Sequence, residues 1–244
     1  MKSQKPAVLV IGGSGEIGSR ICMDLANMGF AVGIHYVSNR SRALETLNEV
    51  ENKSEGRIFR SALQTPEDIL ALSNHFFKWT ENPFGLVLSG GIIPWKNWKN
   101  LSRKDWVSTF MHHCVAPFEL ARVMSMHLPP GSRVVFLSSI SPKYGGSETT
   151  LHYAAAKAAG ETAILGLAMR LRKRRICYNV VRAGYIETDS QIKHRSAKVL
   201  RKRKSIIYLK RGGMPEEVSY LITSLFDRRA GYVANQKFSV SGGD

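Results

Sequence analysis

The sequence predicts an α/β protein with a doubly wound parallel sheet of about seven strands and helices on both faces. Short apolar runs alternate with longer amphipathic segments along the whole chain, and the first apolar run leads directly into a cluster of glycines. Strands that alternate with helices are joined by right-handed crossovers, which make the sheet parallel. No linker or internal repeat interrupts the series, so we expect one domain that spans residues 1–244.

The first strand and the glycines that follow it predict a binding site for a dinucleotide. Residues 7–11 are continuously apolar, as a strand covered on both faces requires, and an amphipathic helix follows until about Gly29. Glycines allow a tight turn and a close approach to a pyrophosphate, whose charge is held by amides at the helix N-terminus. This Rossmann-type arrangement gives five candidate cofactor contacts: Gly12, Ser14, Gly15, Ile17 and Gly18.

The second strand, residues 31–36, is expected to end near the ribose that carries adenine. Enzymes that use NAD usually place an acidic residue about 20 residues past the glycine loop. Residues 31–44 contain no Asp or Glu, and Arg40 and Ser41 stand there instead. A cation and a hydroxyl suit a 2′-phosphate, which favours NADPH. The alternative is that these residues are solvated and open the next helix, with Ser41 as its cap.

The later elements continue the same alternation. The apolar and amphipathic patterns predict strands at 57–63, 85–91, 133–138, 176–181 and 236–240, and helices at 66–79, 102–127, 151–170 and 215–227.

The predicted helix 151–170 carries the pair of residues best suited to chemistry. Tyr153 and Lys157 stand at i and i+4, on one face of that helix. A free tyrosine has a pKa of about 10, and a fixed positive charge nearby lowers that pKa toward the range of general acid catalysis. Ser139, at the end of the strand before it, could hold a carbonyl oxygen beside the phenol. The alternative is an ordinary amphipathic helix with a surface Tyr and Lys.

Composition argues against several other classes of protein. The polar start of the chain has no signal-peptide core, and no apolar run reaches the roughly 18 residues of a membrane span. The three cysteines lie far apart without a C-x-x-C pair, and the histidines are not spaced as metal ligands. We therefore expect a cytoplasmic protein with free thiols, no metal and no membrane association.

Taken together, these motifs resemble the short-chain dehydrogenase/reductase family over nearly the whole chain. The later motifs that carry the resemblance are Ser89-Gly90-Gly91, Ser139, Tyr153 with Lys157, Ala183-Gly184, Ile186-Glu-Thr188, and the closing segments 231–236 and 240–243. Among subgroups, residues 179–189 and the C-terminal segment are most similar to 3-oxoacyl-[acyl-carrier-protein] reductases.

The resemblance implies hydride transfer from NADPH to a ketone. It implies that Tyr153 is the proton donor, that Lys157 tunes the phenol and binds the nicotinamide ribose, and that Ser139 orients the carbonyl. The cofactor performs the difficult step, and the protein supplies position and charge. The resemblance also implies a tetramer and further cofactor contacts at Leu63, Gly90, Gly184, Ile186 and Thr188.

The sequence departs from the family pattern at three functional positions. Glu16 stands where a glycine is common, and a carboxylate near a pyrophosphate is unfavourable unless it points away. Ala62 replaces an Asp that often holds the adenine amino group. His113 occupies the place of an Asn that relays protons through Lys157, which a neutral imidazole could also do. The alternative for His113 is a packed histidine with no catalytic part.

The net charge of +16 is concentrated in two segments. Residues 170–175 hold five Lys or Arg, and residues 190–215 hold nine with no acidic residue. The resemblance places the second segment, about 189–213, over the substrate cleft, and we call it the basic lid. Such a field steers acidic partners, so we expect a 3-oxoacyl chain on an acidic acyl carrier protein. The candidate docking residues are Arg172, Lys173, Arg175, Arg195, Lys198, Arg201 and Lys202.

Other interpretations of the charge remain open. The basic lid could be a solvated, mobile helix, and the substrate could be a free small ketone, pteridine, sugar or steroid. Nucleic-acid binding through the run 201–204 is disfavoured, because the basic runs lack interleaved aromatic residues for base stacking.

Overall fold

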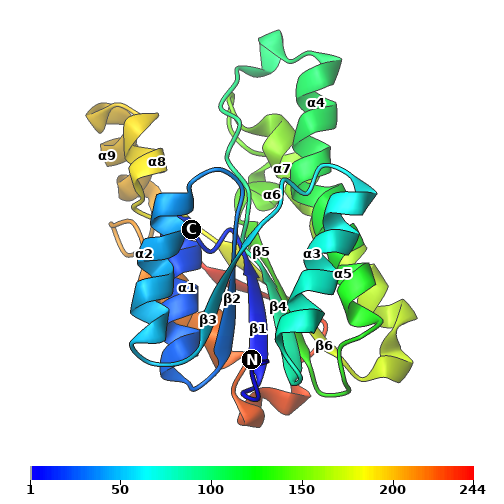
Figure 1. Cartoon of the computed structure of the whole chain (residues 1–244). Helices are drawn as coiled ribbons and strands as arrows, with labels where there is room; N and C mark the ends of the chain where they lie inside the picture. The colour runs from blue at the N-terminus through cyan, green and yellow to red at the C-terminus, as the bar shows by residue number, and fades with distance from the viewer. Residues whose placement is uncertain (1) are drawn as a thin grey trace.

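The computed structural model describes residues 2–244, which form one seven-stranded sheet covered by helices (Figure 1). Every pair of neighbouring strands is parallel, in the order β3-β2-β1-β4-β5-β6-β7. This confirms the predicted fold class. The strands are β1 Ala7–Ile11, β2 Ala31–Tyr36, β3 Gly56–Arg60, β4 Pro83–Leu88, β5 Arg133–Ser139, β6 Cys177–Ala183 and β7 Gln236–Val240.

Two layers of helices enclose the sheet. The α-helices are α1 Glu16–Asn27, α2 Arg40–Glu51, α3 Pro66–Trp79, α4 Arg103–Phe110, α5 Ala116–Ser125, α6 Ser141–Tyr144, α7 Leu151–Arg170, α8 Asp189–Lys193, α9 Ala197–Ile206 and α10 Pro215–Ser224. Short 3-10 turns lie at η1 Trp98–Asn100, η3 Arg172–Arg174 and η4 Arg228–Tyr232. Helices α1, α2 and α10 cover one face, and α3, α5 and α7 cover the other.

The sequence of β1 explains how both layers form. All five residues of β1 are buried, and successive side chains point to opposite faces of the sheet. Leu9 joins the core under α3, α5 and α7, whereas Val8 and Val10 join the core under α1 and α10. A strand that is apolar on both faces therefore lies inside the sheet, here between β2 and β4.

The predicted helix 102–127 is interrupted in the structure by a π-helical segment, η2 Met111–Val115. Pro117 has no N–H to donate to the carbonyl of His113, and the Ala116 N–H bonds to Met111 instead. The His113 carbonyl faces α7, where a Cβ on Gly160 would lie only 2.6 Å from it. The wider turn thus lets η2 and α7 approach closely and fixes the direction of His113.

Smaller differences occur at the ends of elements. The third strand ends at Arg60 rather than residue 63, and Leu63 adopts a left-handed conformation with φ of 54°. Helix α2 is capped by Asn39, whose side chain accepts from the Arg42 N–H, so the alternative of a Ser41 cap is wrong. Asn and Ser have similar preferences for the N-cap position, so the sequence alone does not distinguish Asn39 from Ser41 as the cap.

The sheet has a topological switch point between β1 and β4. The chain proceeds from β1 outward to β2 and β3, and then returns to the other side of β1 to form β4. Loops at the carboxyl ends of these two strands diverge and leave the crevice in which α/β proteins bind ligands. Within residues 2–244, no helix combines the length and apolarity that a membrane span requires.

Candidate active site

The loop between β1 and α1 lies directly against the loop after β4. Gly12 has φ of 75°, and a Cβ there would lie 2.7 Å from the Cα of Gly90. A Cβ on Gly18 would lie 2.0 Å from the Gly12 carbonyl oxygen. These glycines keep the space at the N-terminus of α1 free of side chains, and Ser14, Gly15 and Ile17 belong to the same turn. The cradle fits the pyrophosphate of a dinucleotide.

His35 on β2 supports this glycine loop, and the sequence reasoning missed it. Its Nδ1 accepts from the Gly12 N–H at 3.2 Å, and its Nε2 bonds the Ser61 carbonyl at 3.0 Å. Burial lowers the pKa of His35 to about 4, so the ring is neutral at pH 7 with its proton on Nε2. The sequence did contain a signal for this role, because His35 is a polar residue inside an otherwise apolar strand.

Glu16 does not point into the glycine cradle. Its carboxylate accepts hydrogen bonds from the Asp189 N–H at 3.0 and 3.2 Å, at the start of the basic lid. Thr188 immediately precedes Asp189 as the N-cap residue of α8. This contact directs the Glu16 carboxylate away from the expected pyrophosphate site. It also joins the glycine loop to the lid.

The residues expected near the adenosine ribose are exposed at the start of α2. Arg40 is the first residue of that helix, and Ser41 donates to Glu45 at 3.3 Å. Leu63 follows the neighbouring strand, and its N–H donates to the Ser61 hydroxyl at 3.3 Å. The Arg40 guanidinium has no hydrogen-bonded partner among residues 2–244, so it is free to meet an anion.

Ser139, Tyr153 and Lys157 meet at the carboxyl edge of the sheet. Ser139 is the last residue of β5, and the other two side chains lie on one face of α7 with only 8% and 4% of their surfaces exposed. Lys157 Nζ donates to the Leu137 carbonyl at 2.7 Å and lies 5.9 Å from the centre of the Tyr153 ring. The alternative of a surface Tyr and Lys is therefore wrong.

The electrostatics of this pair differ from the expectation. Burial raises the pKa of Tyr153 to about 12, opposed by a hydrogen bond with Ser139. Burial lowers the pKa of Lys157 to about 7, opposed by Glu161. The predicted lowering of the Tyr153 pKa by Lys157 is wrong for the protein alone, because the ammonium points at the Leu137 carbonyl and the phenol is desolvated.

His113 packs edge-on against Tyr153, with ring centres 4.9 Å apart and planes at 88°. Its Nε2 bonds the Ile92 carbonyl at 3.0 Å, and its buried Nδ1 has no partner among residues 2–244. Burial and the charge of Lys157 lower the pKa of His113 to about 3, so the ring is neutral. Among the described residues, no hydrogen bond links His113 to Lys157. The proton relay through His113 therefore remains a prediction.

The basic lid contacts the loop after β4 through Trp95, a residue that the sequence reasoning did not single out. The His194 ring stacks on Trp95 with centres 5.9 Å apart, and the Arg195 guanidinium lies 4.7 Å above the same ring. Arg195 also lies 5.9 Å from the centre of the Tyr185 ring. Arg195 is therefore half-buried against these two rings.

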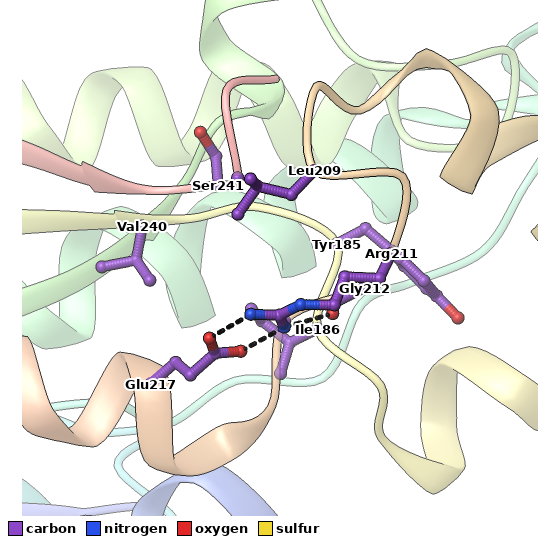
Figure 2. Close-up of a pocket in the computed structure, with 10 residues that line it drawn as sticks. Tyr185, Ile186, Leu209, Arg211, Gly212, Glu217, Val240 and Ser241 are labelled. Carbon is purple, nitrogen blue, oxygen red and sulfur yellow. Dashed lines mark hydrogen bonds and ion pairs between the residues drawn. The ribbon is translucent and has the colours of Figure 1, made fainter.

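Both ends of the lid are fixed to the body of the protein. At its C-terminal end, Arg211 forms a bidentate ion pair with Glu217 (Figure 2), and the Gly213 N–H donates to the Tyr185 carbonyl at 2.9 Å. Ile186 pairs with Gly213 in a short parallel bridge. These contacts hold the lid at its base, and a partly open cavity of about 40 Å³ remains between the segments.

The remaining predicted cofactor contacts lie in the segment between β6 and the lid. The Gly184 N–H donates to the Val240 carbonyl at 2.8 Å, and a Cβ on Gly184 would lie 2.7 Å from Ser241. Ile186 is buried and Thr188 is half-buried at the start of α8. This segment therefore leaves the carboxyl edge of the sheet beside Glu16 of the glycine loop.

The two basic segments lie at opposite ends of the parallel strands. Arg172, Lys173 and Arg175 lie before β6 begins, whereas the lid follows the end of that strand. A seven-residue strand is about 23 Å long, so these three residues cannot line the same chain's cleft. Within the lid, Lys198, Arg201 and Lys202 are exposed and have no acidic partner among residues 2–244, whereas Lys204 pairs with Glu187 at 2.7 Å.

Comparisons with known proteins agree with this geometry. A family model described as enoyl-(acyl carrier protein) reductase matches residues 13–244. The chain is 28% identical to the uncharacterized oxidoreductase YgfF of Escherichia coli K12, over 96% of this chain and 98% of that protein. It is 27% identical to a 3-oxoacyl-[acyl-carrier-protein] reductase FabG of Aggregatibacter actinomycetemcomitans, over 97% and 98%.

A solved structure shows the same architecture. A dehydrogenase/reductase from Sinorhizobium meliloti 1021 superposes with a TM-score of 0.93 at 25% identity, covering 99% of this chain and 96% of that one. The glycine cradle, the Ser139, Tyr153 and Lys157 arrangement and the family model lead to one conclusion. The chain belongs to the short-chain dehydrogenase/reductase family and is an NAD(P)-dependent oxidoreductase of the ketoreductase type.

Proposed function

We propose that this protein uses NADPH to reduce a ketone to a secondary alcohol, and that its substrate is a 3-oxoacyl chain on an acidic acyl carrier protein. The observation that supports the reaction is the convergence of Ser139, Tyr153 and Lys157 beside the glycine cradle at the carboxyl edge of the sheet. The carrier protein is supported by the basic lid and by the 27% identity to a reductase of that name.

Each side chain of the site has a distinct part in the reaction. When bound, the cofactor supplies the hydride that reduces the carbonyl carbon. The Ser139 hydroxyl orients the carbonyl oxygen, and the Tyr153 phenol gives that oxygen its proton. Lys157 binds ribose hydroxyls and stabilises the phenolate that remains. The part we assign to neutral His113, which packs against the Tyr153 ring, is to return a proton to the site after each turnover.

The preference for NADPH is assigned to Arg40, whose guanidinium is exposed and free of acidic partners at the start of α2. A cation at this position stabilises a 2′-phosphate, and residues 31–44 contain no acidic residue to bind the 2′-hydroxyl of NADH. The test compares kcat/KM for NADPH and NADH in the wild type and in an Arg40→Ala, Arg42→Ala double variant. Equal efficiency with both cofactors in the wild type, or an unchanged preference in the variant, would exclude this assignment.

The docking surface is assigned to the exposed face of the lid. Lys198, Arg201 and Lys202 are the unpaired cations there, and Arg201 also lines an open groove of about 550 Å³ with Leu200 and Lys204. Rim charges mainly raise the association rate, and their effect fades above about 0.15 M salt, where the Debye length is roughly 8 Å. The Arg172–Arg175 run was also a docking candidate from the sequence. Because it lies at the other end of β6, we do not assign it to the docking surface of the same chain.

The test presents one 3-oxoacyl group either on carrier protein or on a short thioester mimic, at low and high salt. Docking predicts a large preference for the carrier protein that salt erodes, and a weaker preference in a Lys198→Ala, Arg201→Ala, Lys202→Ala variant. A matched control removes the same number of charges at Arg172, Lys173 and Arg175, at the far edge of the sheet. Equal efficiency on both substrates at every salt concentration contradicts the carrier-protein proposal.

A second candidate substrate is a free planar ketone. Trp95, Tyr185 and Arg195 lie together where the lid contacts the loop after β4, and flat rings and guanidinium groups stack well on planar ligands. Turnover of a bicyclic aromatic ketone above that of the 3-oxoacyl substrate would favour this candidate. A Trp95→Ala variant then loses the aromatic substrate selectively.

We also propose a homo-oligomer, in keeping with the tetramer that the resemblance implies. Strand β7 forms one edge of the sheet, so its outer backbone groups are free to pair with another chain. Light scattering that gives the mass of a single 27.2 kDa chain would contradict this proposal.

A further inference from the structure

A buried carboxylate lies one helical turn after Lys157. Glu161 has 1% of its side chain exposed, and it accepts three hydrogen bonds and forms one further ion pair. The partners are Ser138 Oγ at 2.7 Å, Arg182 at 2.8 and 2.5 Å, and Lys237 Nζ at 3.2 Å. They come from three neighbouring strands, β5, β6 and β7. A buried charge persists only where it is paired and hydrogen-bonded, as it is here.

This carboxylate shares a helix face and a strand end with the catalytic pair. Lys157 and Glu161 stand at i and i+4 on α7, which places them on one face of the helix. Lys157 bonds the Leu137 carbonyl and Glu161 bonds the Ser138 hydroxyl, and Ser139 is the next residue of the strand. Two consecutive contacts therefore fix α7 against the end of β5, immediately before the serine that faces the substrate.

We propose that Glu161 is a positioning residue for the reaction, because it anchors α7 to β5 through Ser138 and supplies a negative charge that opposes deprotonation of buried Lys157. The proposal rests on the proposed function, in which Lys157 acts as a cation. It assigns Glu161 no contact with the substrate or cofactor.

The surroundings of Lys157 explain why it needs this charge. The groups that face it are Tyr153 on α7, neutral His113 on η2, and the carbonyl and ring of β5. Arg182 on β6 and Lys237 on β7 lie behind Glu161 and share its carboxylate. Among all these groups, Glu161 is the one anion, so it adds a full negative charge to the support that the ammonium receives from the Leu137 carbonyl and the Phe136 ring.

The directions of the pKa shifts agree with this arrangement. Burial lowers the pKa of Lys157 to about 7, and Glu161 opposes that shift. Burial would raise the pKa of Glu161, but hydrogen bonds from Arg182, Ser138 and Lys237 outweigh it and lower that pKa. Glu161 therefore stays ionised over the range in which Lys157 titrates. Loss of its charge moves the deprotonation of Lys157 to lower pH.

Three variants separate charge from packing. Glu161→Gln keeps the shape and can still accept from Ser138, but it removes the charge, so Lys157 should titrate about one pH unit lower. Lys237→Met removes a competing cation whose side chain is already 38% exposed, and Lys157 should titrate at higher pH. Ser138→Ala removes one anchor without changing any charge, so it should lower kcat at every pH and leave the titration of Lys157 unchanged.

The direct readout is the titration of ¹³C-labelled lysine side chains by NMR in the protein without cofactor, with a Lys157→Met variant to assign the signal. The same titration is repeated in the three variants, and circular dichroism establishes that each is folded. Opposite shifts in Glu161→Gln and Lys237→Met support the proposal, and the second variant alone decides it if the first does not fold. An unshifted Lys157 signal in folded Glu161→Gln and Lys237→Met overturns it.

The activity measurement distinguishes failure of this inference from failure of the proposed function. With an active ketone substrate, the basic limb of kcat against pH should move in the same direction as the lysine signal in each variant. Equal loss of kcat at all pH values in Glu161→Gln would make the residue purely structural. If no ketone is reduced by the wild type, the proposed function fails, and the NMR titration still decides whether Glu161 holds the charge on Lys157.

Discussion

Replacement of Gly18 by alanine tests the cofactor cradle most severely. The added Cβ would lie 2.0 Å from the Gly12 carbonyl oxygen and 2.7 Å from its carbon, so the start of α1 must move by roughly 1 Å or more. Overpacking of this kind costs about 1–3 kcal/mol, and the better helix propensity of alanine returns about 1 kcal/mol. We expect a net loss of up to about 2 kcal/mol in the free energy of unfolding.

The effect on cofactor binding should be larger than the effect on stability. Amides at the start of α1 must point at the pyrophosphate, and each 1.4 kcal/mol of lost interaction weakens binding about tenfold. We expect the Kd for NADPH, measured by fluorescence titration, to rise at least about tenfold. The matched control is Gly166→Ala in α7, where an added Cβ meets no atom within 4 Å. Gly18→Ala with wild-type affinity and stability would refute the assignment of the cradle.

Three further predictions concern residues that the structure places around the cofactor and Tyr153. Glu16→Gln removes a negative charge from the edge of the cradle, so it should tighten NADPH binding severalfold at low salt; unchanged or weaker binding would contradict this. His113→Asn should retain most activity if the side chain relays protons, whereas normal rates in His113→Leu would make the residue structural. Because the pKa of His35 is lowered to about 4 in the folded protein, the unfolded state binds its proton first, and the free energy of unfolding should fall as the pH drops from about 6.5 to 4. His35→Gln should remove up to about 3 kcal/mol of this pH dependence in urea titrations, and an unchanged pH dependence would argue against the neutral bridge.

The parts of the fold that depend on local pattern could be predicted from the sequence. The apolar run 7–11 indicated a central strand because a strand buried on both faces has no polar side. The spacing of Tyr153 and Lys157 placed them on one helix face because the helical repeat fixes it. Their neighbour Ser139 could be added because the carboxyl ends of parallel strands share one edge of the sheet.

The parts that depend on contacts between distant elements could not be predicted. The direction of the Lys157 ammonium is set by the Leu137 carbonyl, twenty residues away, and the sequence does not reveal this contact. The π-helical turn before Pro117 arises from packing against Gly160 as well as from the proline itself. The sequence also does not reveal at which end of the strands a cluster of basic residues such as Arg172–Arg175 lies.

The measurement that tests the central claim most directly is NADPH oxidation by the wild type and a Tyr153→Phe variant with a 3-oxoacyl thioester. Phenylalanine keeps the ring that packs against His113 and removes only the hydroxyl that donates the proton. General acid catalysis contributes about 10²–10⁴-fold, so we predict a loss of kcat of at least about 100-fold, with Kd for NADPH within about threefold of the wild type. Wild-type turnover by Tyr153→Phe would contradict the account.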